Sequence, residues 1–278
     1  MNICEINSSK SNCKMNLNEL IDIAITAAIR AGEKIAEVYS SVDFQVVLKE
    51  DHSPVTIADR NAHDEIVRTL EITKLPVLSE EGIHSNFDER KDWNLFWLVD
   101  PLDGTKEFIK RNDEFTVNIA LIQDSHPIAG VIYVPITCEL YAGILGSGAF
   151  RLIHPEENCT FQNMQLSGVQ LPEEKKLDQF TVVVSRSHMN PETEAYIEIF
   201  RQKYGPITVL NMGSSLKICR IAEGKATIYP KFGQTMEWDI AAGHAILKAA
   251  GKNICLPDLK TELIYNKEDL HNPFFIAQ

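Results

Sequence analysis

The sequence predicts an α+β fold, and three observations support this class. Residues 95–99 form an unbroken apolar run closed by turn residues, which is typical of a strand buried on both faces. Four β-rich segments follow within 115–153 without a helical pattern between them, which indicates an antiparallel meander. Beyond residue 179, short strand and helix patterns alternate, as in a smaller α/β unit.

The bulk composition narrows the possible classes of function. The 278-residue chain is long enough for one large domain or two of moderate size. Its 44% hydrophobic and 24% charged residues are ordinary for a globular protein. A net charge of −12 and a pI near 5.2 argue against binding polymeric nucleic acid, which needs a basic surface. A small anionic ligand stays compatible with this charge, because bound metal ions can invert the local field.

Cysteine usage and the lack of targeting signals set the expected location. The six cysteines are scattered, with no CxxC pair and no histidine cluster at zinc spacing, so we expect reduced thiols in a cytoplasmic protein. No signal peptide or transmembrane segment is expected, because no apolar stretch has the required length. The expected location is the cytoplasm, and peripheral attachment to the inner membrane stays open.

Apolar periodicity and turn residues define the expected elements. Helical spacing predicts helices at 17–39, from 55 onward, and at 191–204, 214–222 and 238–250. Strands are expected at 43–49, 75–79, 95–99, 115–122, 128–134, 139–145, 149–153, 180–184, 207–210 and 226–229. Asn16 with Glu19 forms a capping-box pattern ahead of the first helix, and Thr56 is a candidate cap for the second. Residues 146–148 fit a hairpin turn better than a phosphate loop, because no helix follows them.

Acidic residues occur where the central buried strand is expected to end. Asp100 and Asp103 follow the run 95–99, and Pro101 and Gly104 are expected to turn the chain there. Two carboxylates in such a place would repel each other strongly unless a cation held them. Oxygen-only ligands suit hard ions, so Mg²⁺ is the natural candidate.

Four further acidic residues are candidate functional residues, but each also has a purely structural explanation. Glu80 and Glu81 follow the strand expected at 75–79, but paired acids before a loop are usually just solvated. Asp59 and Asp239 each fall in the first turn of a predicted helix, where the helix dipole favours a carboxylate without any catalytic role. Both explanations stay open for each residue on this evidence.

The chain is expected to divide into three parts. Residues 1–15 are predicted to be a disordered extension, residues 16–179 a metal-binding α+β half that contains the meander, and residues 180–278 a smaller α/β half that completes the active site. The polar segment 154–179 is the best boundary candidate, because it contains two prolines and several acids.

Taken together, the motifs resemble those of the inositol monophosphatase superfamily, whose members are Mg²⁺-dependent, lithium-sensitive phosphomonoesterases. The resemblance covers about residues 17–270 and rests on four motifs in order: Asp59 in its helix turn, Glu80–Glu81, residues 100–105 and residues 238–243. Four further stretches are most similar to 3′(2′),5′-bisphosphate nucleotidases of the bacterial CysQ type: 184–188, 213–217, 222–226 and 229–233. One departure is Lys231, where the family pattern usually has arginine, so a bidentate phosphate contact would become a point-charge contact.

The resemblance implies a layered αβαβα sandwich with two or three Mg²⁺ ions in the active site. The implied metal ligands are Glu80, Asp100, the Leu102 carbonyl, Asp103 and Asp239, with Asp100 shared by two ions. Thr105 would orient the attacking water, and Asp59 or Glu80 would accept its proton. Backbone N–H groups of Gly104 and Thr105 would receive phosphate oxygens.

The resemblance also implies a set of contacts to substrate. They are Leu102, Asp103, Gly104, Thr105, Ser187, His188, Gly213, Ser214, Lys217, Lys231 and Asp239. Lys217 ranks first among the cations, because it lies one helical turn after Ser214 at a helix N-terminus, a ready anion site. A solvated surface role stays open for each cationic, serine and histidine candidate, including Arg186 and Ser215.

The expected activity is hydrolysis of the 3′-phosphate of adenosine 3′,5′-bisphosphate to AMP and phosphate, as part of sulfur assimilation. The 3′-phosphoadenylyl sulfate precursor is a second candidate substrate. An inositol- or sugar-phosphate monophosphatase with the same metal centre is an alternative, and a catalytically silent metal- or nucleotide-binding regulator is an alternative of another class. The presence of every expected carboxylate and of Thr105 disfavours the silent regulator. A monomer and a homodimer both stay open.

Overall fold

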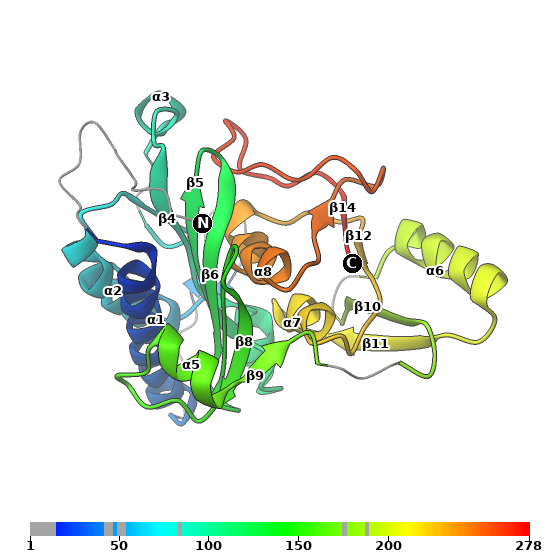
Figure 1. The fold of residues 1–278 in the computed structure, drawn as a ribbon, viewed down its shortest axis with the longest axis horizontal. Coiled ribbons are helices and arrows are strands. Elements are labelled where there is room, and N and C mark those ends of the chain that lie inside the picture. Colours follow the sequence, from blue (N-terminus) through cyan, green and yellow to red (C-terminus); the bar gives the residue numbers. More distant parts are fainter. Residues whose placement is uncertain (1–14, 42–46, 49–53, 83–84, 174–176, 187–188) are drawn as a thin grey trace.

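Figure 1 shows the elements of the computed structural model stacked in five layers, in the order helix, sheet, helix, sheet, helix. The model describes residues 15–41, 47–48, 54–82, 85–173, 177–186 and 189–278. This arrangement confirms the predicted αβαβα sandwich. No helix within these described ranges is long and apolar enough to cross a membrane.

The first two layers are a helical pair and a seven-stranded sheet. α1 (Leu17–Tyr39) and α2 (Ile57–Leu70) pack on one face of this sheet, where α1, α2 and inward-facing strand residues form one hydrophobic core. The strands lie in the order β3 (Val77–Ser79), β4 (Leu95–Asp103), β5 (Thr116–Gln123), β6 (His126–Val134), β7 (Glu139–Ile144), β8 (Gly148–Ile153) and β9 (Val169–Leu171). Every neighbouring pair is antiparallel except β3 with β4, so the predicted meander is confirmed.

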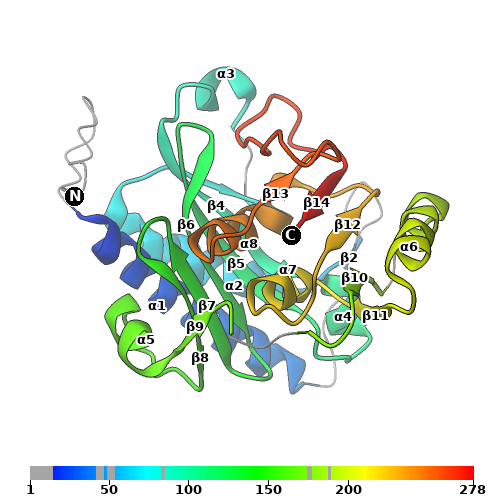
Figure 2. The ribbon, with the colours of Figure 1, turned by 45° about the vertical axis from the view of Figure 1, so that its right-hand side comes forward.

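The third layer is the helical pair α7 (Leu216–Ala222) and α8 (Glu237–Ala249), which packs on the opposite face of the large sheet. The rotated view in Figure 2 shows α8 directly over the strands. Glycines in the sheet permit this close approach: a Cβ on Gly130 would lie 2.4 Å from the Ala242 carbonyl oxygen of α8. The backbone of α8 is therefore held tightly against the sheet that also carries Asp100 and Asp103.

The fourth and fifth layers complete the sandwich. β10 (Thr181–Ser185) and β11 (Thr208–Met212) form a parallel pair, and a bridge from Val182 to Ile228 leads into the antiparallel strands β12 (Tyr229–Lys231), β14 (Phe275–Ala277) and β13 (Ile254–Cys255). α6 (Pro191–Tyr204) packs on the outside of β10, with Ile197 against Val182 and Val184. The remaining elements are β1 (Val47–Leu48), β2 (Pro54–Val55), the 3₁₀ turn Glu71–Thr73, α3 (Phe87–Arg90), α4 (Thr105–Ile109) and α5 (Phe161–Ser167).

Most predicted elements are found within a few residues of their expected bounds, and the capping box at Asn16 and the cap at Thr56 are present. Val55, however, lies in β2 and pairs with Val47 of β1, so α2 begins only at Ile57. Apart from residues 47–48, the strand expected at 43–49 lies outside the described residues, as do residues 1–14 of the expected extension.

The segment 154–179 is more structured than its composition indicated. It contains α5, and it also contains β9, which extends the large sheet by pairing with β8. The division of the chain into halves at this segment stays a prediction.

The contact between Gly130 and α8 gives a test of how closely α8 packs on the large sheet. We expect Gly130→Ala to lower the free energy of unfolding by about 2–3 kcal/mol in urea titrations, because a backbone carbonyl blocks the added methyl group. Gly143→Ala is the matched comparison, since its Cβ would meet α8 at 3.0 Å and should cost clearly less. Equal effects of the two substitutions would contradict this packing.

Candidate active site

A β-bulge places both carboxylates of the central motif on one face of the sheet. The prediction that the strand ends before Asp100 is wrong: in the ladder with β5, Asp100 pairs with Asn118 and Asp103 with Thr116. Three steps along β4 thus match two along β5, so β4 holds one extra residue. Residues three apart in a regular strand point to opposite faces, but the extra residue brings these two to the same face. Pro101, which lacks an N–H, is tolerated at such an irregularity.

Carboxylates gather where β3, β4 and α8 meet. Glu80 directly follows β3, and its N–H donates at 3.1 Å to the carbonyl that precedes Asp100. Asp239 lies in the first turn of α8 and accepts from the Met236 N–H at 2.9 Å. Asp239 thus lies in the first helical turn, as the sequence predicted, and the same geometry also directs this residue toward the acidic motif of β4.

Removal from water and mutual repulsion raise the pKa of these aspartates. Burial is the largest cause for Asp100, followed by the negative charges of Glu80, Asp103 and Asp239, and it lifts the pKa well above the usual range. Burial and then the charges of Asp103 and Glu80 do the same to the pKa of Asp239. Burial also raises the pKa of Asp103, opposed by the charge of Lys217. A cation bound between the carboxylates would relieve this repulsion.

The donor atoms at this place fit a hard cation. They are carboxylate oxygens together with the Leu102 carbonyl, and such all-oxygen sets are typical of Mg²⁺ sites. Within the described ranges, no three His, Cys, Asp or Glu side chains are close enough together to hold a metal ion by themselves. Mg²⁺ usually keeps several water ligands beside its protein ligands.

Thr105 and Asp59 form a hydrogen-bonded pair beside the acidic cluster. Thr105 Oγ1 donates to Asp59 Oδ1 at 3.0 Å and lies 3.5 Å from the Leu102 carbonyl oxygen. Asp59 Oδ2 accepts from the N–H and the hydroxyl of Thr56, both at 2.7 Å. Burial raises the pKa of Asp59, and the bonds from Thr56 oppose that rise. Asp59 is thus both a helix cap and the partner of Thr105.

The turn that delivers Thr105 depends on glycine. Gly104 has a φ of +99°, which lies in the left-handed region that favours glycine. Thr105 then begins the short helix α4, which the sequence did not predict.

Two buried lysines lie near the aspartates. Lys217 in α7 is 7% exposed and Lys231 in β12 is 8% exposed. Burial lowers the pKa of Lys217 to about 8, opposed first by the negative charge of Asp103. Burial likewise lowers the pKa of Lys231, opposed by Asp239 and Asp103. Lysine side chains are rarely buried in proteins without a function. The two buried lysines therefore make this region suited to an anion.

The segment that contains Gly213 and Ser214 lies against the turn at Gly104. A Cβ on Gly104 would be 3.3 Å from the Ser214 Cβ, and one on Gly213 would be 2.7 Å from Glu107 Cγ. The buried Ser214 hydroxyl has no hydrogen-bond partner among the described residues. It is therefore available to a ligand at this place.

Glu114 anchors this segment. One of its carboxylate oxygens accepts from the Gly213 N–H at 2.8 Å, and the two oxygens accept from Arg186 Nε and Nη2 at 2.8 and 2.6 Å. Arg186 also donates to the Asn211 carbonyl at 2.9 Å. The guanidinium of Arg186 is thus engaged with protein groups, which argues against its candidate role in substrate binding.

The structure gathers most of the predicted site residues into this one region. They are Asp59, Glu80, Asp100, Leu102, Asp103, Gly104, Thr105, Gly213, Ser214, Lys217, Lys231 and Asp239. Ser187 and His188 lie outside the described residues.

Sequence reasoning missed Asn118 and Glu114. Asn118 lies in the strand β5, which was predicted from its apolar content alone. The available signal was the pair Thr116 and Asn118, two polar residues on one face of an otherwise apolar strand.

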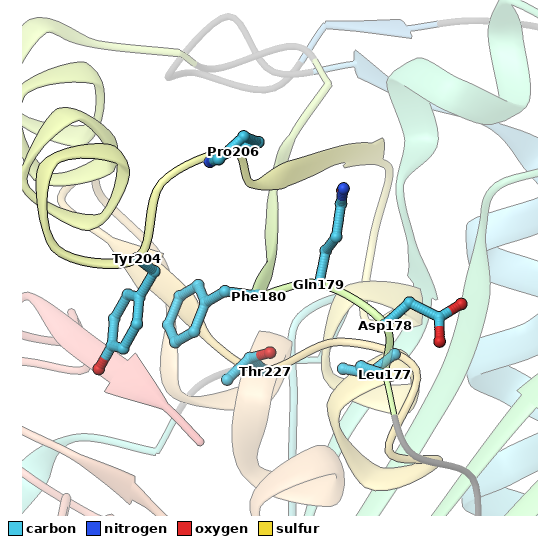
Figure 3. A pocket seen from close by; sticks show the side chains of 7 residues that line it. All are labelled: Leu177, Asp178, Gln179, Phe180, Tyr204, Pro206 and Thr227. Atoms are coloured by element: carbon cyan, nitrogen blue, oxygen red, sulfur yellow. The ribbon is translucent and has the colours of Figure 1, made fainter.

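A surface pocket of about 540 Å³ lies elsewhere on the molecule (Figure 3). Its lining includes Phe180 and Tyr204, whose rings stack with centroids 4.4 Å apart. Phe180 immediately precedes β10, and Tyr204 ends α6 shortly before β11 begins, whereas Arg186 and Gly213 follow the carboxyl ends of these strands. This pocket is therefore separate from the acidic cluster.

Comparison with known proteins gives the class. The model of the inositol monophosphatase family matches residues 16–274, and the chain belongs to this family. Among curated proteins, the 3′(2′),5′-bisphosphate nucleotidase CysQ of Escherichia coli strain K12 is 44% identical over 239 residues, which cover 84% of this chain and 89% of that protein.

Solved structures agree with this class. The crystal structure of CysQ from Bacteroides thetaiotaomicron is 49% identical to the chain, with a TM-score of 0.87 and coverage of 94% of this chain and 97% of that one. Inositol monophosphatase from Anabaena is 24% identical with a TM-score of 0.70, covers 95% of this chain and 91% of that one, and shows the shared fold alone.

The anchoring role of Glu114 can be tested by amide hydrogen exchange. We expect Glu114→Ala to speed exchange of the Gly213 N–H by about ten- to hundredfold, because a partly buried donor loses its acceptor. Arg186→Ala is the control, since it removes the exposed ion pair and leaves the bond from Gly213 to Glu114 in place. Exchange that is equally slow in the wild type and in Glu114→Ala would contradict the anchor.

Proposed function

We propose that the chain is a 3′(2′),5′-bisphosphate nucleotidase that converts adenosine 3′,5′-bisphosphate to AMP and phosphate. Its CysQ relatives are named as 3′(2′),5′-bisphosphate nucleotidases. The observation that carries the proposal is the position of Lys217, Lys231 and the unpartnered Ser214 hydroxyl beside the acidic cluster. A substrate with two phosphates needs such an anion site in addition to the place where phosphate is released.

The family consists of metal-dependent phosphatases. We propose Mg²⁺ as the ion of this chain, with two or three ions held by Glu80, Asp100, the Leu102 carbonyl, Asp103 and Asp239. When bound, Mg²⁺ supplies charge neutralisation at the phosphoryl oxygens and lowers the pKa of a bound water.

The pair of Thr105 and Asp59 is proposed to prepare the attacking water. The Thr105 hydroxyl can accept a hydrogen bond from a water while it donates to Asp59 Oδ1. The raised pKa of Asp59 makes its carboxylate a better proton acceptor than an exposed aspartate. Glu80, which follows β3 beside Asp100, is the second candidate base.

The phosphates are proposed to bind on two sides of the cluster. Backbone N–H groups of Gly104 and Thr105 would receive oxygens of the reacting phosphate. Lys217, Lys231 and Ser214 would hold the other phosphate, with the Gly213 segment shaped by Glu114. Ser187 and His188 are kept as proposed contacts on the resemblance alone.

Each of the two alternative functions leaves a different feature of the site without a role. An inositol or sugar monophosphate has one phosphate and gives no role to the buried lysines. A silent regulator gives no role to the hydrogen bond between Thr105 and Asp59.

The first experiment measures phosphate release from adenosine 3′,5′-bisphosphate and from inositol 1-phosphate, with Mg²⁺ and with EDTA. We expect Mg²⁺-dependent release with a strong preference for the nucleotide. Asp103→Asn should lower kcat by at least about a hundredfold, because it removes a ligand charge. Preference for inositol phosphate would replace the substrate but keep the metal site, and no release from either compound would favour the silent regulator.

The lowered pKa of Lys217 predicts a pH dependence of substrate binding. Lys217 is charged below about pH 8 and loses its charge above it, so KM for the nucleotide should rise several-fold from pH 7 to pH 9.5. Lys217→Met should have a high KM that changes clearly less over this range, with Lys231 as the remaining lysine at this phosphate. The control is Lys252→Met, since burial also lowers the pKa of Lys252, but this residue follows the far end of α8. An identical pH profile in wild type and Lys217→Met would contradict the assignment.

A further inference from the structure

We infer that Asn118 is a positioning residue that fixes the direction of Asp103 and ties the bulge of β4 to the start of α8. The inference rests on the proposed metal site, since its consequence is a change in metal affinity. Asn118 lies opposite Asp100 in the ladder and is fully buried on the face of β5 that meets α7 and α8.

The side-chain amide of Asn118 is fully used within the protein. Its Nδ2 donates to Asp103 Oδ2 at 3.4 Å and to Ser215 Oγ at 3.0 Å. Its Oδ1 accepts from the hydroxyl of Thr116 at 2.9 Å. Each partner is itself buried or half-buried, so water cannot replace these bonds easily.

Ser215 decides which end of the amide faces the carboxylate, because its only hydroxyl proton goes to the Asp239 carbonyl and it can only accept from the Nδ2 end of Asn118. The Thr116 hydroxyl is compatible with this orientation. A threonine hydroxyl that donates to Oδ1 holds this oxygen away from Asp103 and leaves the N–H groups to face it. With the amide turned over, its oxygen would face the Asp103 carboxylate and repel it. The hydrogen bonds of Asn118 to Ser215 and Thr116 therefore preset a donor at the carboxylate before any ligand arrives.

Ser215 extends this connection to the second half of the site. Its hydroxyl accepts from Asn118 and donates to the Asp239 carbonyl at 2.7 Å. Ser215 is 2% exposed and immediately precedes α7. Asn118 thus links the two segments that supply Asp103 and Asp239, which are far apart in the chain.

A positioning role differs from a purely structural one in what it changes. Loss of a buried amide lowers stability wherever it occurs, but only loss of an amide that directs a ligand should weaken metal binding. Groups that orient metal ligands typically change metal affinity by about 10- to 100-fold when they are removed.

The test is titration of the full-length apo-protein with Mg²⁺ alone by calorimetry, together with thermal unfolding in EDTA. We expect Asn118→Ala to weaken Mg²⁺ binding by about 10- to 100-fold. The isosteric Thr116→Val, which keeps the ladder pairing with Asp103 and removes the hydroxyl that donates to Asn118, should weaken it several-fold in the same direction. Asn253→Ala is the matched control, because it removes amide bonds to His244 and to the Ile254 N–H at the other end of α8. It should lower the unfolding temperature and leave Mg²⁺ affinity unchanged.

Other results would overturn the inference in distinguishable ways. Wild-type affinity in both Asn118→Ala and Thr116→Val would show that Asn118 does not direct Asp103, while the proposed function stands. An equal loss of affinity in Asn253→Ala, in proportion to lost stability, would show a structural role only. Absence of Mg²⁺ binding in the wild type would remove the proposed metal site and this inference with it.

Discussion

The register shift between β4 and β5 is the constraint on which the site depends. Asp100 and Asp103 are three positions apart, and a regular strand would turn one of them toward α1 and α2. The extra residue in β4 turns both toward α8, while Leu102 remains in the hydrophobic core on the other face. Within four residues of β4, the bulge therefore directs apolar Leu102 to one face of the sheet and both aspartates to the other.

The layers of the sandwich bring the other groups to this bulge. β3 runs parallel to β4 and ends beside it, so that Glu80 follows directly. α8 packs tightly on Gly130 of the same sheet, which sets the position of Asp239 in its first turn. α2 contributes Asp59 from the opposite layer through its bond to Thr105. Segments that are remote in sequence thus meet because the large sheet has helices on both faces.

Local patterns were sufficient for most elements and for the identity of the acids. Periodicity predicted α1, α6 and α8, since each depends on its own apolar spacing and caps. The continuation of β4 was missed because Pro101 and Gly104 are turn residues in isolation, and only pairing with β5 turns their segment into a bulge. Asn118 and Glu114 were missed for a related reason. Their roles depend on hydrogen bonds to residues that are distant in sequence, namely Ser215 and Gly213.

Burial shifts the pKa values of the acidic and basic groups of the site in opposite directions. These shifts explain how an acidic chain can accept an anion. The pKa values of the aspartates are raised and those of Lys217 and Lys231 are lowered, so each group lacks full compensation within the protein. Divalent cations would compensate the aspartates, and a phosphate would compensate the lysines and also share the cations. Because each occupant lowers the cost of binding the other, metal and phosphate should bind cooperatively. The net charge of −12 then opposes the anion only at long range, where salt screens it.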